Sequence, residues 1–292
     1  MCGIFSYISR SQHKKPYDNV ITNFNKIKNR GPDNTQYKII NNVFLGFHRL
    51  SINDVTSAGN QPMKYKDYYL ICNGEIFNHL DIKYKYGFKT NSNSDCEIIL
   101  HLYDYLVNHE NNMNNKSNVI RQLCNELDAE FSFILYDTKL DVIYVARDPY
   151  GVRPLFIGRT NNYNSECIDN EDYIFSSELK GLTDLVENVE QFPPGYYLIL
   201  ENNKDNDKIL SIKEKYHEII IYKTFNINDD IILENLNKTF RKAVYKRMMS
   251  DKEICSLLSG GLDSSLVASI VSEKLGPNRL KTFAIGIEGS PD

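Results

Sequence analysis

Residues 1–9 read MCGIFSYIS, in which a cysteine and a glycine come directly before a short apolar run. The β-branched and aromatic residues of that run predict a strand that begins close to the first residue of the chain. Chain ends are usually frayed and carry little structure. A reactive thiol, that of Cys2, at the start of such a strand therefore indicates a chemical role for this end of the chain.

The thiol of Cys2 gains a base of its own if Met1 is removed, because the free α-amine then belongs to the same residue. An α-amine has a pKa of about 7.7–8.0, so part of it is neutral at pH 7 and can accept the thiol proton. One residue then supplies both nucleophile and base, and Gly3 lets the backbone approach a substrate closely. An incidental thiol at a loose end is the alternative, and it is favoured until the other motifs are considered.

The segment NGEIFN (73–78) follows a predicted strand and offers donors for a negatively charged oxygen. Acyl transfer passes through a tetrahedral oxyanion, which needs hydrogen-bond donors aimed at the developing charge. The side-chain amide of Asn73 and the backbone N–H of Gly74 would supply two. The alternative is an ordinary Asn-Gly hairpin turn, and we expect the strand to run into a turn here.

Three charged residues complete a predicted site for an amino acid that carries a side-chain amide. Arg49, in FHRLSIND (47–54), comes just after a predicted strand and would grip an α-carboxylate in bidentate fashion, with a surface salt bridge as the alternative. Asp95 or Glu75 would bind the α-ammonium group, although Asp95 serves equally well as a helix N-cap.

Composition argues against several classes of protein. The chain has 292 residues, of which 41% are hydrophobic and 25% charged, and its net charge is −4. A mildly acidic chain without a basic stripe is a poor candidate for binding nucleic acid. No apolar run reaches the roughly 18 residues of a membrane helix, and no secretory signal is visible. We therefore expect a cytoplasmic protein without membrane contacts, whose six scattered cysteines are reduced.

The order of predicted elements indicates two domains. Residues 2–200 read mainly as antiparallel strands with a few amphipathic helices, and residues 201–227 read as a linker. Residues 228–292 read as a helix and then a strand–helix–strand unit, which implies a parallel sheet. One such unit cannot form a sheet covered on both faces, so we expect this chain to be a fragment of a longer protein.

The turn inside that unit, in SLLSGGLDSSLVAS (256–269), has the character of an anion site. It is no Walker A sequence, because no GK[ST] follows the glycines. Gly260 and Gly261 expose backbone N–H groups at a helix N-terminus, which favours phosphate. Hydroxyl donors come from Ser259, Ser264 and Ser265. The alternative is a strand-to-helix turn capped by serine.

Seven short motifs occur together in a familiar order: MCGIF, RGPD (30–33), FHRLSI, NGEIFN, SDCEII (94–99), RDPYGVRPLF (147–156) and SSELKGL (176–182). In this order they resemble glutamine amidotransferases with an N-terminal cysteine, over essentially residues 2–200. The resemblance implies an α+β domain, a four-layer α/β/β/α sandwich of antiparallel sheets, with glutaminase activity.

The resemblance also implies roles for individual residues. The catalytic positions are Cys2, Asn73 and Gly74. The glutamine-binding positions are Arg49, Leu50, Ser51, Ile52, Asn53, Asn73, Gly74, Glu75 and Asp95. The segment RDPYGVRPL resembles a structural hairpin of the family, so neither Arg147 nor Arg153 is expected to be catalytic.

A glutaminase followed by LLSGGLDSS and FAIGIEGSPD resembles the glutamine-hydrolysing asparagine synthetase family. The resemblance implies an ATP-pyrophosphatase domain, begun here over residues 228–292, that uses ATP with Mg²⁺ to activate aspartate as β-aspartyl-AMP. Ammonia from the first site displaces AMP. The implied ATP-binding residues are Leu257, Ser259, Gly260, Gly261, Asp263, Ser264 and Ile285. The implied partners are glutamine, aspartate and ATP, with a homodimer as one assembly, no protein-held metal and no cofactor for the glutaminase step.

Two alternatives stay open at this point. A glutaminase with another acceptor, such as a phosphoribosyl or sugar-phosphate amidotransferase, lacks the glycine-rich loop, and β-lactam-forming relatives lack the glutaminase residues. The second alternative is a regulatory module that binds glutamine without hydrolysing it. Because most of the second domain lies beyond residue 292, we expect this chain to hydrolyse glutamine without making asparagine.

Overall fold

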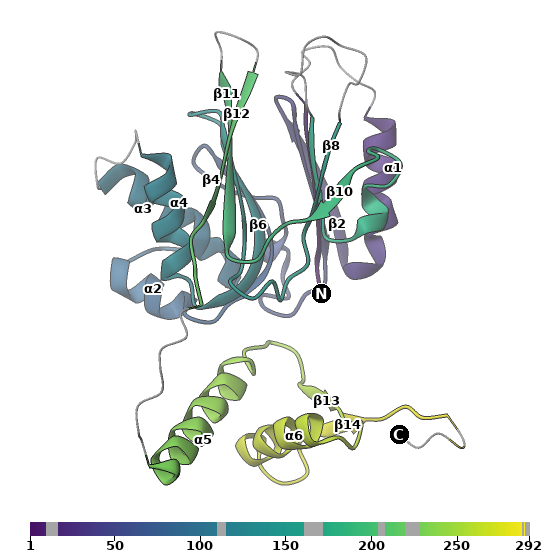
Figure 1. Cartoon of the computed structure of the whole chain (residues 1–292), viewed down its shortest axis with the longest axis vertical. Coiled ribbons are helices and arrows are strands. Elements are labelled where there is room, and N and C mark those ends of the chain that lie inside the picture. The colour runs from purple at the N-terminus through teal and green to yellow at the C-terminus, as the bar shows by residue number, and fades with distance from the viewer. Residues whose placement is uncertain are drawn as a thin grey trace. The chain divides into compact units, whose positions relative to one another are not determined.

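The computed structural model describes residues 1–9, 17–109, 115–160, 172–203, 208–219, 228–287 and 289. The chain divides into two compact units, Met1–Ile219 and Ile220–Asp292, which are described separately below (Figure 1). The first unit contains two six-stranded sheets that face each other.

The first sheet is antiparallel, with the strand order β10-β8-β9-β1-β3-β2. Its strands are β1 (Gly3–Ile8), β2 (Asn34–Ile40), β3 (Val43–Arg49), β8 (Phe156–Arg159), β9 (Tyr173–Ser176) and β10 (Val189–Gln191). The expected N-terminal strand is thus confirmed as β1, an inner strand that pairs with β9 on one side and β3 on the other.

The second sheet is also antiparallel, with the order β12-β11-β7-β6-β5-β4. Its strands are β4 (Met63–Tyr65), β5 (Tyr68–Ile76), β6 (Ala129–Asp137), β7 (Val142–Arg147), β11 (Tyr196–Asn203) and β12 (Lys208–Lys215). The predicted linker over residues 201–227 needs correction, because β12 falls within it and pairs along its whole length with β11. The charged residues of β12 are typical of an edge strand. Because of them, the segment lacks the apolar pattern from which a strand is predicted.

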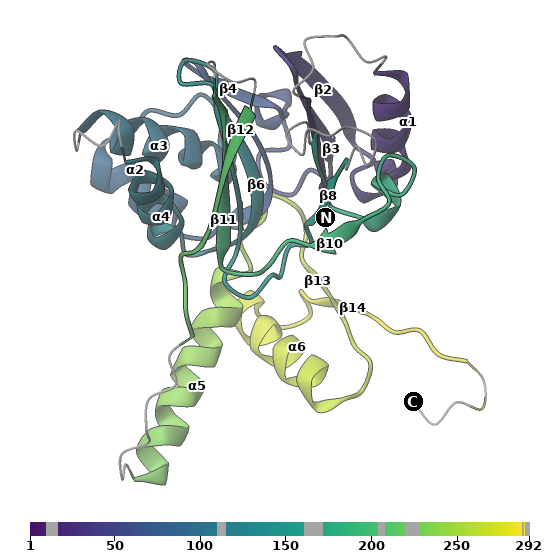
Figure 2. The same cartoon turned by 45° about the horizontal axis from the view of Figure 1, so that its top comes forward.

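Helices cover the outer face of each sheet, as Figures 1 and 2 show. Helix α1 (Asp18–Lys26) lies against the first sheet, while α2 (His79–Tyr86), α3 (Ile98–His109) and α4 (Lys116–Glu126) lie against the second. Short 3₁₀ turns are η1 (Lys28–Arg30), η2 (Ser57–Gly59), η3 (Asp95–Glu97) and η5 (Leu179–Gly181). The four-layer α/β/β/α sandwich is confirmed. Among the described helices, none combines the length and apolar character that crossing a bilayer would require.

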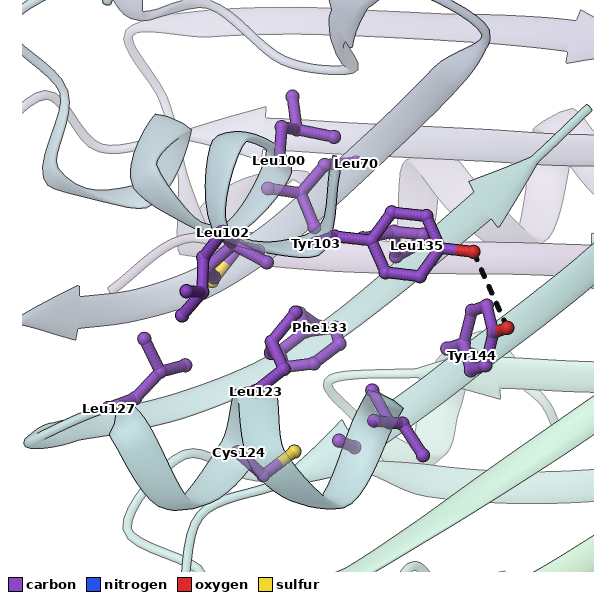
Figure 3. Packing of buried hydrophobic residues seen from close by; sticks show 14 of the residues in the cluster. Leu70, Leu100, Leu102, Tyr103, Leu123, Cys124, Leu127, Phe133, Leu135 and Tyr144 are labelled. Carbon is purple, nitrogen blue, oxygen red and sulfur yellow. Dashed lines mark hydrogen bonds between the residues drawn. The ribbon is translucent and has the colours of Figure 1, made fainter. Parts of the chain in front are cut away.

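The packing of α3 and α4 on the second sheet fixes the frame on which the site is built. Leucine, phenylalanine and tyrosine side chains from both helices and from β5, β6 and β7 form one buried cluster (Figure 3). Within it, the Tyr103 hydroxyl lies 2.9 Å from Asp137 Oδ2 and 3.4 Å from the Tyr144 hydroxyl. These bonds satisfy polar groups in an otherwise apolar layer, which would cost free energy if they were left unpaired.

The second unit holds α5 (Asp229–Lys246), β13 (Cys255–Leu257), α6 (Leu262–Leu275) and β14 (Lys281–Phe283). Strands β13 and β14 are parallel, with Leu257 opposite Phe283. The predicted strand–helix–strand unit is therefore present. Because parallel strands end at the same edge of a sheet, the loop after β13 and the residues after β14 share one edge.

Candidate active site

The cysteine ahead of β1 is anchored in place. Arg30 Nε donates to the carbonyl oxygen of Cys2 at 2.8 Å, and the Leu50 N–H donates to its Sγ at 3.3 Å. The thiol lies 3.5 Å from the Leu50 carbonyl oxygen, to which it donates in turn. Since β1 is an inner strand, this end of the chain is ordered in spite of its terminal position.

The thiol faces a cavity of about 40 Å³ that most of the predicted glutamine-site residues line. These predicted residues are Cys2, Arg49, Leu50, Ile52, Asn53, Asn73, Gly74, Glu75 and Asp95. Ser51 is the exception: its backbone N–H bonds to Asp33 Oδ2 at 2.7 Å, and the residue does not line the cavity. The RGPD turn, which contains Asp33, therefore holds this segment from outside.

Asn73 lies inside strand β5, directly opposite Ser132 of β6. The expected turn at Asn73–Gly74 is therefore wrong, because the strand continues to Ile76. Asn73 is only 2% exposed, and within the described residues its Nδ2 has no hydrogen-bond partner. A buried amide donor without a partner costs free energy of folding. The Asn73 amide is therefore a candidate donor to an acceptor on a bound ligand.

The N–H of Gly74 points to the same open edge of β5. The Cys72 N–H bonds to Gln61 Oε1 and the Ile76 N–H to Asp95 Oδ2, each at 2.6 Å and each away from β6. Alternate residues of a strand direct their N–H groups to the same side, so the Gly74 N–H between them faces the cavity edge as well. A Cβ at Gly74 would lie 2.9 Å from the Glu130 carbonyl oxygen and 3.0 Å from Cys72 Sγ, so this close packing excludes a side chain.

Arg49 is buried, so it is not placed for the surface salt bridge considered as its alternative. Its Nη1 donates to the Thr56 carbonyl at 2.6 Å and to Asn60 Oδ1 at 2.7 Å. Its Nη2 donates to the carbonyl oxygens of Asn53 and Asp54. Both Nη groups thus order the loop that follows β3. To bind a carboxylate in bidentate fashion, Arg49 would have to give up some of these hydrogen bonds to the loop.

Two carboxyl groups line the cavity. Asp95 accepts from the Ile76 N–H at 2.6 Å and from Asn53 Nδ2 at 3.5 Å, so it ties η3 to β5 instead of capping a helix. Glu75 Oε1 lies 3.1 Å from Arg153 Nη2. Burial raises the pKa of both carboxyl groups, although the Ile76 N–H opposes the shift at Asp95 and Arg153 opposes it at Glu75.

The thiol needs a base in this environment. Burial raises the pKa of Cys2, although the Leu50 N–H and nearby positive charge oppose the shift, so the thiol is protonated at neutral pH. Burial lowers the pKa of the terminal amine, here on Met1, and Arg30 and Arg153 lower it further. A lowered pKa increases the neutral fraction of the amine at a given pH, which favours a role as proton acceptor.

Several residues of the cavity wall were not predicted: Met1, Phe47, Gly59, Gln61, Cys72, Ser94, Cys96 and Arg153. Gln61 orders β5 beside Asn73, because its Nε2 also donates to the Cys72 carbonyl at 3.1 Å. Arg153 belongs to a motif that the sequence did display, RDPYGVRPLF, but nothing in the motif tells which of its side chains reaches the cavity.

The second unit carries the glycine-rich loop between β13 and α6. Gly260 has a φ of +88°, and an added Cβ there would meet nothing within 4 Å, so the backbone stands open. Ser264 Oγ donates to the Gly261 carbonyl at 3.2 Å and accepts from the Ser259 N–H at 3.3 Å. Open backbone at the start of a 14-residue helix, lined with hydroxyl groups, fits a phosphate chain.

The other predicted ATP residues are exposed in this unit. Leu257, Asp263 and Ile285 are exposed, and Ile285 follows β14 at the sheet edge that carries the loop. In the described part of the chain, no group of three or more histidine, cysteine, aspartate or glutamate side chains is placed to hold a metal ion.

Comparison with known proteins gives the class first. The family model described as "Glutamine amidotransferase domain" matches residues 1–214, and the chain belongs to this family. The fold agrees: glutamine phosphoribosylpyrophosphate amidotransferase from B. subtilis superimposes with a TM-score of 0.55 at 18% identity, covering 97% of this chain and 65% of that one. The predicted resemblance to glutamine amidotransferases is confirmed.

The comparisons then point to one kind of amidotransferase. A family model described as "Asparagine synthase" matches residues 235–292. A probable glutamine-hydrolysing asparagine synthetase of Acanthamoeba polyphaga mimivirus is 37% identical over all of this chain and 53% of its own length. The glutamine-hydrolysing asparagine synthetase of Rattus norvegicus is 38% identical over 91% of this chain and 49% of its own. The chain spans about half the length of the curated relatives it matches.

Proposed function

We propose that this chain hydrolyses glutamine to glutamate and ammonia in the cavity around Cys2. The observation that carries the proposal is Asn73 Nδ2, a buried donor without a hydrogen-bond partner among the described residues, which lines the same cavity as the thiol. An oxyanion formed on the substrate amide would give this donor its acceptor, with the Gly74 N–H as the second donor.

The reaction begins once Met1 has been removed. The α-amine of Cys2 takes the thiol proton, and the thiolate attacks the amide carbon of glutamine. The tetrahedral oxyanion is held by Asn73 and Gly74. The amine then passes its proton to the departing nitrogen, ammonia leaves, and a γ-glutamyl thioester remains. Water attacks the thioester, which releases glutamate and returns the thiol.

Charged groups around the cavity orient the substrate. Arg49 would hold the α-carboxylate, while Asp95 and Glu75 would accept the α-ammonium group. The backbone and side chains of Leu50, Ile52 and Asn53 form the wall next to the thiol. Ser51 would contribute indirectly, because its bond to Asp33 holds the neighbouring residues Leu50 and Ile52 in place.

Ammonia release from glutamine tests the proposal. We expect release by the chain after an intact-mass measurement has shown that Met1 is absent. Cys2→Ala and a chain with a retained N-terminal extension should both be inactive, because one lacks the thiol and the other the free amine. Activity in either variant would refute the mechanism, and glutamine binding without ammonia release by the processed chain would favour a regulatory module.

We further propose that the full-length protein makes asparagine from aspartate, as the names of its relatives state for them. Ser259, Gly260, Gly261 and Ser264 would hold the phosphates of ATP, and Leu257, Asp263 and Ile285 would complete the nucleotide site. Mg²⁺ would enter with the nucleotide, since it is commonly bound through substrate phosphates. ATP supplies the activation of aspartate as β-aspartyl-AMP, and ammonia from the Cys2 cavity would displace AMP.

The products of ATP cleavage test this second proposal. The full-length protein should release AMP and pyrophosphate in an aspartate-dependent manner, as measured by nucleotide chromatography. ADP as product would exclude the proposed role of the loop after β13. A homodimer, a cytoplasmic location and the absence of nucleic-acid or membrane partners stay predictions from the sequence.

A further inference from the structure

The expected hairpin in RDPYGVRPL is wrong, because this segment is the loop that leads from β7 in the second sheet to β8 in the first. Hydrogen bonds within this loop fix the direction of one arginine. Asp148 Oδ1 accepts from the Tyr150 and Val152 N–H groups, each at 3.0 Å, and Oδ2 accepts from the Arg153 N–H at 3.1 Å. Arg147 Nε donates to the Arg153 carbonyl at 2.8 Å. The backbone of Arg153 is thus gripped on both sides by two buried charged residues.

The side chain of Arg153 enters the wall of the Cys2 cavity, where it is 8% exposed. Its Nη2 lies 3.1 Å from Glu75 Oε1 and 3.6 Å from Glu130 Oε2. Glu75 and Glu130 are directly opposite each other on β5 and β6, and like charges in that position repel. The guanidinium between the two carboxyl groups offsets this repulsion.

We propose that Arg153 is a positioning residue of the glutamine site, whose guanidinium holds the Glu75 carboxylate at the cavity wall to receive the α-ammonium group of the substrate. This inference rests on the proposed glutaminase function. The loop between β7 and β8 would then hold one positive charge at a fixed place beside Glu75.

The electrostatics of Glu75 show why the cation matters. Among the described residues, the charged groups that face this carboxyl are Arg153 from the β7–β8 loop, Glu130 from β6, Asp95 from η3 and the terminal amine ahead of β1. Burial raises the pKa of Glu75, Arg153 opposes this shift, and Asp95 and Glu130 add to it. Without Arg153 the carboxyl moves toward its protonated form, which carries no charge for an ammonium group.

Binding of two ligands tests the proposal without relying on turnover. Isothermal calorimetry with the Cys2→Ala chain would compare L-glutamine with 4-carbamoylbutanoate, which is glutamine without its α-amino group. In this background, we expect Arg153→Met to weaken glutamine binding about tenfold while 4-carbamoylbutanoate changes less than about twofold. A merely structural role would weaken both ligands alike, and that result, or no change in either, would overturn the proposal.

Three further variants sharpen the measurement. Arg121→Met removes an exposed arginine paired with Glu214 and should leave the ratio of the two affinities unchanged.

In a Glu75→Gln background, Arg153→Met should have no additional effect on the ratio, because Arg153 acts through Glu75. If Arg153→Met does not fold, Arg153→Lys decides: a single ammonium cannot match the planar guanidinium, so the ratio should fall about threefold, and an unchanged ratio would overturn the proposal.

The proposed function and this inference fail in different ways. If the processed chain with Cys2 intact releases no ammonia while the Cys2→Ala chain still discriminates between the ligands through Arg153, only the hydrolysis is refuted. If ammonia is released but discrimination is unchanged in Arg153→Met, only the role of Arg153 is refuted.

Discussion

At the scale of single residues, the proposed site includes one side-chain amide donor, that of Asn73, for which the described residues supply no partner. Asn73 is fixed by the pairing of β5 with β6, and its Nδ2 lies buried beside the cavity. Preorganised donors of this kind stabilise a transition state because they need no rearrangement when charge develops. In the proposed mechanism, an oxyanion on the substrate would supply the acceptor that offsets the free-energy cost of this unpaired amide.

Asn73→Ala is therefore expected to reduce kcat for glutamine hydrolysis by about 10²–10³-fold, with a much smaller change in KM, since the lost bond forms mainly in the transition state. Steady-state ammonia release measures both constants. Asn188→Ala, at an exposed position of the same unit, is the matched control and should keep the parent rate. A rise in KM with unchanged kcat would assign Asn73 to ground-state binding instead.

Residue-level chemistry was largely readable from the sequence, but the contacts of each side chain were not. Cys2, Asn73 and Asp95 were placed in one site on the strength of their motifs, and they do line one cavity. The partners of Arg49 are mostly backbone carbonyls of a loop, whose path no sequence pattern encodes. The sequence does not predict Arg153 as a residue of the site. Its motif indicates a turn of the backbone but does not tell which side chains reach the cavity.

At the scale of elements, Glu97 of η3 and His101 of α3 hold the loop that comes directly before Asp95. Glu97 accepts from the Asn91 N–H at 2.8 Å and the Ser92 N–H at 2.7 Å, and His101 Nε2 lies 3.2 Å from it. Burial would raise the pKa of Glu97, but His101 and the Asn91 and Ser92 groups outweigh it and lower this pKa to about 2.

This lowered pKa predicts a defined acid sensitivity. An unfolded glutamate titrates near 4.3, so the stability that ionised Glu97 provides is fully present above about pH 4.3 and is lost as pH falls toward 2. Urea denaturation between pH 5 and about pH 2.5 should therefore show a shallower loss of stability in Glu97→Gln than in the parent chain. Equal slopes for the two chains would contradict the assignment.

The sequence predicts an element best where the buried side chains recur at the spacing of a helix or a strand. The apolar spacing of Val20, Ile21, Phe24 and Ile27 predicts a helix over residues 17–29. Helix α1 buries Val20 and Phe24, Ile21 is partly buried, and Ile27 is the buried residue that caps the C-terminus of the helix. Strand β12 was missed because it is an edge strand rich in lysine and glutamate, with Leu210 and Ile212 exposed. The strand through Asn73 and Gly74 was cut short because Asn-Gly is a strong local turn signal, which pairing with β6 overrides.

At the scale of the whole molecule, the described residues that line the cavity around Cys2 belong to the first unit. They lie between Met1 and Arg153, inside Met1–Ile219, and this unit has its own cores between and outside the sheets. A unit with its own buried core is expected to fold alone.

A chain that ends at residue 219 should therefore fold cooperatively and release ammonia from glutamine at a rate within about threefold of the 292-residue chain. Circular dichroism on heating and the ammonia assay would check both parts. An unfolded or inactive product would show that residues 220–292 contribute to the first unit.

The position of β1 also constrains how the protein matures. An aminopeptidase must draw the first residues into its own cleft, yet the finished fold holds residue 2 through Arg30 and Leu50. Strand β9, which pairs with β1, ends at Ser176, so the ribosome needs roughly 9 to 35 s to supply it at 5–20 residues per second. Removal of the initiator methionine, which the proposed mechanism requires, would fall in that interval, while the growing chain still leaves its first strand exposed at one edge.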